Sequence, residues 1–229
     1  MKGLKWEALI LAIGIALAGA KIADGMKAER VVNVKGLAEK EIMANKVTWP
    51  LAYRVLGNDP IKLYSEIKEK NEAVVKFLKE NGIEDHEIAV GAPVTIDLKA
   101  ERYSNYENKS ERYNTTSVIT ITSDKIDTVR KLVAEQGELL KRGIATVDEY
   151  GYRVSYEYTK LNDIKPALIE EATKNARITA EQFAEDSDSK LGKIRNANQG
   201  QISIMDASET TPHIKKVRVV TSVSYLLKN

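Results

Sequence analysis

The sequence contains no cysteine and only two histidines among its 229 residues. Without cysteine the chain offers no disulfide, no thiolate nucleophile, no zinc–thiolate site and no iron–sulfur cluster. The histidines, His86 and His213, lie far apart in the sequence, and neither has a second histidine at metal-ligand spacing. We therefore expect no metal and no cofactor, with His86 in an exposed turn and His213 in a loop.

Sequence motifs for nucleotide binding and hydrolysis are also missing. Neither GxGxxG nor GxxxxGK[ST] occurs, so nucleotide phosphates have no recognisable site, and no GxSxG marks a hydrolase nucleophile. Residues 186–189, Asp-Ser-Asp-Ser, lack the glycine and distal glutamate of a calcium-binding loop, and we interpret them as a helix end. These absences favour a protein that is not an enzyme. A ligand-binding or enzymatic domain whose site is built from scattered polar residues stays open as the alternative.

The charge balance argues against nucleic acid as a partner. The formal net charge is only +2, and the mixture of 43% hydrophobic and 30% charged residues is that of an ordinary globular chain. A field this weak does not draw a protein onto a polyanion.

The N-terminal segment predicts export. A basic start precedes an apolar run from Ala8 to Ala20. A cleaved signal peptide would use the small residues 18–20 as its cleavage site, whereas an uncleaved transmembrane anchor would use residues 4–23. We favour the anchor, and both alternatives place the body outside the cytoplasm. Residues 1–30 are therefore assigned as anchor or signal segment, and residues 31–229 as the folded domain.

The first half of the body predicts a strand, a helix and two more strands. Apolar residues alternate over residues 46–56, and Pro50 predicts a sheet edge or a bulge there. Asp59 and Pro60 are typical of a helix start, and Gly82 of its end. The residues expected on the inner face of this helix are Ile61, Tyr64, Ile67, Val74, Val75 and Leu78.

Two further strand patterns follow at residues 88–98 and 116–122, and polar residues 99–114 between them predict a long hairpin connection. Asp124 can cap a short helix that stops near Gly137.

The second half repeats this order of elements. A strand would place Tyr152, Tyr156 and Tyr158 on one face, and a long helix would start at Asp163. Extended segments then follow, and Gly192 comes after the helix much as Gly82 does in the first half. The predicted fold class is α+β, with two β-α-β-β units forming mainly antiparallel sheets with packed helices, behind an N-terminal transmembrane helix. The residues expected to be buried are Trp49, Val74, Leu78, Ile121, Leu132, Val154, Phe183 and Val223.

The polar hairpin is the first candidate interaction surface. It carries a Glu-Arg-Tyr triplet twice, with a further tyrosine between the two copies. Arginine and tyrosine are enriched at binding hot spots. The candidate residues are Arg102, Tyr103, Tyr106, Arg112 and Tyr113.

Two separated motifs carry a family resemblance. Residues 32–39 read Val-Asn-Val-Lys-Gly-Leu-Ala-Glu, and residues 172–184 form a helical segment with alanine at every fourth position and the pair Ala176-Arg177. Together they resemble the SIMPL-domain family, a domain of unknown function, and its bacterial envelope branch in particular. The small residues predict close packing of this helix, and Arg177 is the charged member of the motif.

The resemblance implies a location rather than a reaction. Members of that branch carry an uncleaved N-terminal helix, which implies a single-pass anchor in the cytoplasmic membrane and a periplasmic body. The expected function is a non-catalytic binding or structural module of the envelope that forms a homo-oligomer. The resemblance names no ligand and no protein partner.

Overall fold

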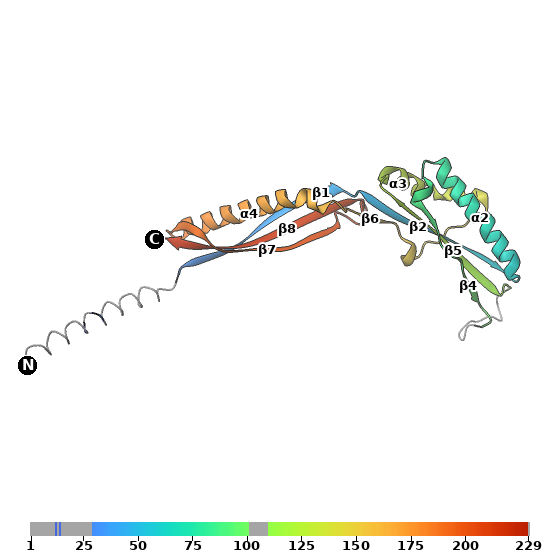
Figure 1. Cartoon of the computed structure of the whole chain (residues 1–229), viewed down its shortest axis with the longest axis horizontal. Helices are drawn as coiled ribbons and strands as arrows, with labels where there is room; N and C mark the ends of the chain where they lie inside the picture. Colours follow the sequence, from blue (N-terminus) through green and yellow to red (C-terminus); the bar gives the residue numbers. More distant parts are fainter. Residues whose placement is uncertain (1–11, 13, 15–28, 101–109, 229) are drawn as a thin grey trace, which may run out of the picture. The chain divides into compact units, whose positions relative to one another are not determined.

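A computed structural model describes residues 12, 14, 29–100 and 110–228. The chain divides into two compact units (Figure 1). We call one the α4 unit, after its helix; it contains Ala167–Ile202 and Val219–Asn229 together with the N-terminal part up to Ala38. The other, the α2 unit, contains Glu39–Pro166 and Ser203–Arg218.

The α2 unit is built on a five-stranded sheet. Its strands have the order β3-β5-β2-β6, and β4 pairs with β5 beside β3. All of these pairings are antiparallel. The strands are β2 (Lys46–Gly57), β3 (Ile88–Val90), β4 (Val94–Asp97), β5 (Tyr113–Ser123) and β6 (Ser155–Glu157).

Two helices cover one face of this sheet (Figure 1). They are α2 (Pro60–Glu80) and α3 (Ile126–Ala134). Short 3-10 helices follow at Asp85–Glu87, Gln136–Arg142 and Tyr150–Tyr152. Alternate residues of β2 point at the helices and form the core with them. The predicted core positions that belong to this core are Trp49, Val74, Leu78, Ile121 and Leu132. Val154 packs against this core but is only partly buried.

Helix α2 begins where the sequence predicts. Asp59 Oδ1 accepts hydrogen bonds from the Ile61 and Lys62 amides at 2.9 and 3.3 Å, and Pro60 is the first helical residue. The prediction for its inner face is wrong at two positions, because Leu63 is buried there while Ile61 and Tyr64 are exposed. Neighbouring positions on a helix lie about 100° apart, so a one-residue error turns a side chain away from the sheet.

The prediction that Pro50 lies at a sheet edge is confirmed, because β6 pairs with β2 only as far as Thr48 and, in the described part of the chain, Pro50 pairs only with β5. Two other local predictions in this unit need correction. The expected tyrosine face is wrong, because Tyr152 belongs to a 3-10 helix while Tyr156 lies in β6. Asp124 does not cap α3; the side-chain Oγ of Ser123 instead accepts from the Lys125 amide, at 2.9 Å.

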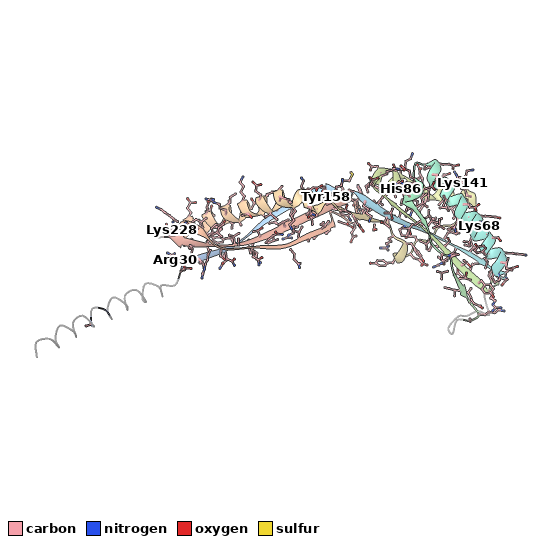
Figure 2. The ribbon with its side chains drawn as sticks, viewed as in Figure 1. Arg30, Lys68, His86, Lys141, Tyr158 and Lys228 are labelled. Carbon is pink, nitrogen blue, oxygen red and sulfur yellow. The ribbon has the colours of Figure 1, made fainter. Side chains whose placement is uncertain are left out.

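The α4 unit consists of a three-stranded sheet with one helix along it (Figure 1). The strand order is β1 (Val31–Met43), β8 (Ile214–Lys228) and β7 (Lys190–Asp206), and the helix is α4 (Leu161–Asp186). The Leu227 amide donates to the Arg30 carbonyl at 2.8 Å, which places the start of β1 beside the end of β8, where Figure 2 shows Arg30 close to Lys228.

Alanines on α4 form its buried stripe. Ala172, Ala176, Ala180 and Ala184 are all buried, as the predicted close packing requires. Phe183 is 56% exposed, so its predicted burial is wrong: Ala184 takes the inward position beside it. Val34, Val223 and Tyr225 complete this core.

The end of α4 is a capped helix terminus, as predicted for residues 186–189. The amide of Ser189 donates to the Ala184 carbonyl at 2.8 Å, and Asp188 adopts a left-handed φ of 50°. Gly192 lies inside β7, so it does not match Gly82, which has a φ of 89° after α2.

The α+β class and the antiparallel sheets are confirmed, but the second unit pairs differently from the prediction. β6, predicted to belong to the second unit, joins the sheet of the α2 unit instead. β1 takes the position beside β8 in the sheet of the α4 unit. The predicted anchor lies outside the described residues apart from Ala12, Gly14 and residues 29–30. Among the described residues, no helix is long and apolar enough to cross a membrane.

Candidate binding surfaces

The base of the predicted hairpin is a closed structure. β4 and β5 pair antiparallel up to Asp97 and Tyr113, which confirms a hairpin connection between them. Arg112 donates to both carboxylate oxygens of Asp97, with Nη2 at 2.6 Å from Oδ2, and its guanidinium lies 5.0 Å from the ring centroid of Tyr113. These hydrogen bonds are the main reason why the pKa of Asp97 is lowered. Arg112 and Tyr113 thus hold the hairpin base together.

The remaining hairpin candidates, Arg102, Tyr103 and Tyr106, lie outside the described residues. Arg177 is described. It is an exposed side chain whose Nε donates to Glu181 Oε1 at 2.8 Å, one helical turn further along α4. That hydrogen bond is the main cause of the raised pKa of Arg177. Arg177 belongs to the α4 unit, whereas the hairpin base belongs to the α2 unit.

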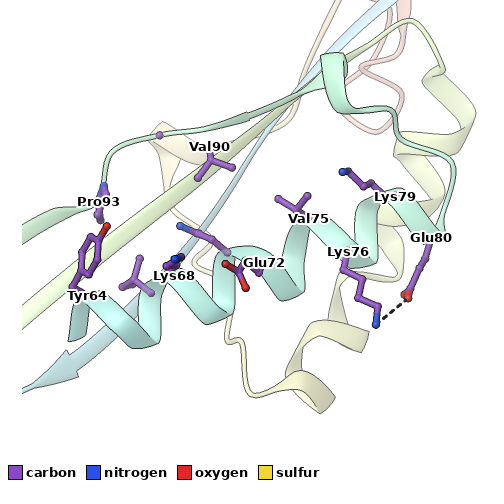
Figure 3. Close-up of a pocket in the computed structure, with 12 residues that line it drawn as sticks. Tyr64, Lys68, Glu72, Val75, Lys76, Lys79, Glu80, Val90 and Pro93 are labelled. Carbon is purple, nitrogen blue, oxygen red and sulfur yellow. Dashed lines mark ion pairs between the residues drawn. The ribbon is translucent and has the colours of Figure 1, made fainter. Parts of the chain in front are cut away.

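A groove with a volume of about 640 Å³ lies between α2 and β3, the edge strand of the sheet that α2 covers (Figure 3). Tyr64 and Pro93 lie close together at one end, while Val75 and Val90 line its middle. Tyr64 is 66% exposed and Val90 is 50% exposed, so apolar surface is left open to solvent here. The sequence pattern does not predict this site, because its helical spacing places Tyr64 on the buried face of α2.

The helical wall of the groove is held in place by a buried side chain network. Asn71 Oδ1 accepts hydrogen bonds from the Tyr53 hydroxyl and from Ser117 Oγ, both at 2.8 Å, which ties α2 to β2 and β5. The Tyr53 hydroxyl also lies 3.0 Å from the Ile67 carbonyl oxygen. Burial raises the pKa of Tyr53, so its hydroxyl remains a hydrogen-bond donor.

The opposite side of the groove is an edge strand with a bulge. Val90 pairs with Ile119 and Val94 pairs with Thr116, so residues 91–93 lie opposite only two residues of β5. The extra residue shifts the alternation of side chains by one position. Val90 therefore shares the α2 side of the sheet with buried Ile119, whereas Val94 faces the other side and is 63% exposed.

Basic side chains predominate along the rim of the groove. Lys68, Lys76 and Lys79 line it together with Glu72 and Glu80 (Figure 3). Lys76 lies 4.0 Å from Glu80, and Glu80 is also 3.1 Å from the guanidinium of Arg142 on the neighbouring 3-10 helix. Glu80 is thus shared by two cations, while Lys79 pairs with Asp85, so the rim carries only a small excess of positive charge.

The buried carboxylate of Glu87 belongs to a structural cluster outside the groove. Ser123 Oγ donates to it at 2.5 Å, the Glu84 amide at 2.7 Å and Lys125 Nζ at 3.0 Å. Burial by itself raises the pKa of Glu87, but these three donors outweigh burial and lower it. The cluster fastens the turn after α2 to the end of β5 and the start of α3.

The two histidines lie in different surroundings. His86 is exposed (Figure 2), with Nδ1 3.5 Å from Glu84 Oε2, as expected of a turn histidine. His213 is more buried than its loop position predicts, because its ring packs edge-on against Tyr156 with centroids 6.1 Å apart. Within the described ranges, no group of three histidine or acidic residues could hold a metal ion.

Strand β7 presents a different kind of surface. It pairs with β8 on one side, and no strand in the described part of the chain pairs with its other side. Residues 196–202, Asn-Ala-Asn-Gln-Gly-Gln-Ile, contain neither a charged residue nor proline, and most of them are exposed. β1, at the opposite edge, carries four charged side chains at Lys35 and residues 39–41.

The two motifs that carry the resemblance meet in the α4 unit. Gly36 of β1 lies directly against Ala172 and Ala176 of α4, at a distance that leaves no room for a side chain. A family profile described as SIMPL, a protein of unknown function (DUF541), matches residues 32–225. The chain belongs to the SIMPL family. Among curated proteins, none matches this SIMPL chain significantly.

Proposed function

We propose that this SIMPL protein is a non-catalytic binding and structural module of the bacterial cell envelope that associates with further copies of itself. Residues 1–30 anchor it in the cytoplasmic membrane, and the body lies on the outer side. The apolar run Ala8–Ala20 behind a basic start supports the anchor.

The unpaired outer edge of β7 is the main observation that supports self-association. An unpaired strand exposes a row of backbone donors and acceptors that can pair with another chain, and proteins usually protect such edges with lysine, proline or bulges. Residues 196–202 contain neither lysine nor proline. A second copy can therefore extend the sheet of the α4 unit by strand pairing, while the charged β1 edge is less suited to it. Hairpin residues Arg102, Tyr103 and Tyr106 remain predicted contributors to association.

The test compares two substitutions of the same type within the full-length chain in detergent. Gln199→Lys places a charge on the β7 edge, whereas Gln182→Lys places it on the exposed face of α4, in the same unit. Native mass spectrometry should find an oligomer for the unaltered chain and for Gln182→Lys. Gln199→Lys should raise the concentration needed for assembly by about tenfold or more. A monomeric unaltered chain, or equal assembly of both variants, would contradict the proposal.

The groove beside α2 supports a second function, ligand binding. Its volume of about 640 Å³ lies within the range of sites that hold small molecules or peptide segments. The described carboxyls with a lowered pKa, Glu87 and Asp97, lie outside the groove, and each has a basic hydrogen-bond partner. The groove therefore supports binding without chemistry.

A further inference from the structure

We propose that the groove between α2 and β3 binds an extended peptide of a protein partner, which adds as a short strand to the outer edge of β3. The peptide places apolar side chains between Val90 and α2 and an acidic side chain beside the rim lysines. This inference rests on ligand binding, the second function above, and is independent of self-association through β7.

The backbone of β3 determines that the ligand is a peptide. The Gly91 amide donates to the Val118 carbonyl at 2.9 Å, so Gly91 is hydrogen-bonded toward β5. Because hydrogen-bonded and non-hydrogen-bonded pairs alternate in antiparallel sheets, the amide and carbonyl of Val90 point the opposite way, to the outer edge. An added strand can pair with both groups, whereas an apolar small molecule can pair with neither.

The side chains around that edge determine what the peptide carries. A strand beside β3 directs alternate side chains to the α2 face, where Val90, Val75, Tyr64 and Pro93 form an apolar surface. The bulge at residues 91–93 ends the regular edge, which limits pairing to a few residues. A short peptide is therefore sufficient to fill the groove.

Charge selects against basic peptides. Lys68, Lys76 and Lys79 line the rim; Lys79 pairs with Asp85, and the carboxylate of Glu80 is shared by Lys76 and Arg142, which leaves a small positive excess. An acidic side chain of the peptide would meet this positive rim, whereas a lysine in its place would be repelled.

The probe is a fluorescently labelled peptide with blocked ends in which valine and threonine alternate and the two outermost valines are replaced by glutamate, so that valine and glutamate both face α2; it is added to the full-length chain in detergent. We expect fluorescence anisotropy to detect binding below about 1 mM. The same peptide with lysine in place of glutamate, and one N-methylated at alternate amides, should each bind at least about tenfold more weakly. Absence of binding by the valine–glutamate peptide up to that concentration would overturn the proposal, as would equal binding of the N-methylated peptide.

The bulge provides a matched pair of variants. Val90→Asp places a carboxylate in the groove, and Val94→Asp places one on the opposite face of the same edge, at a similarly exposed position. Val90→Asp should weaken peptide binding at least about tenfold, while Val94→Asp should leave it unchanged. Circular dichroism and the unfolding midpoint should be alike for both variants, since neither side chain is buried.

Two results would assign the groove to a different occupant and reject the peptide. If 8-anilinonaphthalene-1-sulfonate binds in a Val90-dependent manner while the peptide does not, the groove is a site for apolar small molecules. If Val90→Asp instead lowers the native mass of the peptide-free protein, a second copy occupies the groove. Gln199→Lys, which should weaken assembly through β7, should bind the peptide normally. Peptide binding and assembly through β7 can therefore be tested independently.

Discussion

Gly36 of β1 lies so close to Ala172 of α4 that a Cβ atom built on Gly36 falls 1.8 Å from the Ala172 carbonyl oxygen. The same Cβ would be 2.5 Å from the amide nitrogen of Ala176. The glycine in the strand motif and the alanines in the helix motif are therefore two sides of one contact. It is this contact that lets the backbone of α4 pack directly on the sheet.

Replacing Gly36 with alanine should destabilise the α4 unit by at least about 1–3 kcal/mol, because the helix has to move away from the sheet. Urea unfolding monitored by circular dichroism measures this loss. Gly137→Ala is the matched control, since nothing lies within 4 Å of a Cβ there, and it should change stability little. Adding Ala176→Gly to Gly36→Ala should not restore stability, because the nearest obstacle is the backbone of Ala172. Full rescue by that double change would contradict the packing described.

The Glu87 cluster should make stability depend on pH in the acid range. Because the pKa of Glu87 is lowered in the folded state, its contribution is fully present above the unfolded value of about 4.3 and is lost as pH falls through the lowered folded value. Glu87→Gln should reduce stability at pH 7 by about 1–3 kcal/mol, because it replaces a buried, hydrogen-bonded carboxylate. The variant should also lose part of the acid dependence, as measured by urea unfolding between pH 3 and pH 7.

The control for Glu87 is an exposed glutamate with a similar ion pair. Glu138 lies 2.7 Å from Lys141, and both side chains are more than half exposed. Glu138→Gln should change neither the stability at pH 7 nor its dependence on pH noticeably, since exposed pairs contribute little. Equal effects of the two substitutions would mean that burial of Glu87 does not strengthen its interactions.

Removing Arg112 should release the carboxyl group of Asp97. In the intact hairpin, hydrogen bonds from Arg112 are the main cause of the lowered pKa of Asp97. In Arg112→Ala, an NMR titration should find the pKa of Asp97 raised toward its ordinary value. Arg112→Lys should raise it less, because lysine keeps the positive charge but loses the bidentate geometry. An unchanged pKa in Arg112→Ala would show that Arg112 does not close the hairpin.

Export can be tested with fusions after Asn229. Alkaline phosphatase fused there should be active, and a reporter that works only in the cytoplasm should be silent, because the apolar run Ala8–Ala20 predicts an extracytoplasmic body. The reverse pattern would reject the proposed location. N-terminal sequencing of the mature protein separates the two export alternatives, since a chain that begins at Lys21 has lost its anchor.

Local sequence patterns were sufficient for much of the fold. Asp59 and Pro60 predict the start of α2 because a capping side chain and a fixed φ act within a few residues. The alternation around Trp49 predicts the buried face of β2 for the same reason, since side chains of a strand alternate whatever their partners are. The α+β class followed from such patterns along the chain, whereas the family followed from the resemblance of residues 32–39 and 172–184.

Strand partners and the groove could be decided only by the tertiary structure. The sequence predicts the same order of elements in both halves of the chain, yet β6 pairs with β2 while β1 pairs with β8. Such pairings join residues more than 100 positions apart. Tyr64 and Val90 come together across the groove because α2 packs on β5 and Val90 pairs with buried Ile119 on the α2 side of the sheet. Neither distant pairing nor a one-residue bulge leaves a periodic signal in the sequence, because both depend on which strand is the neighbour.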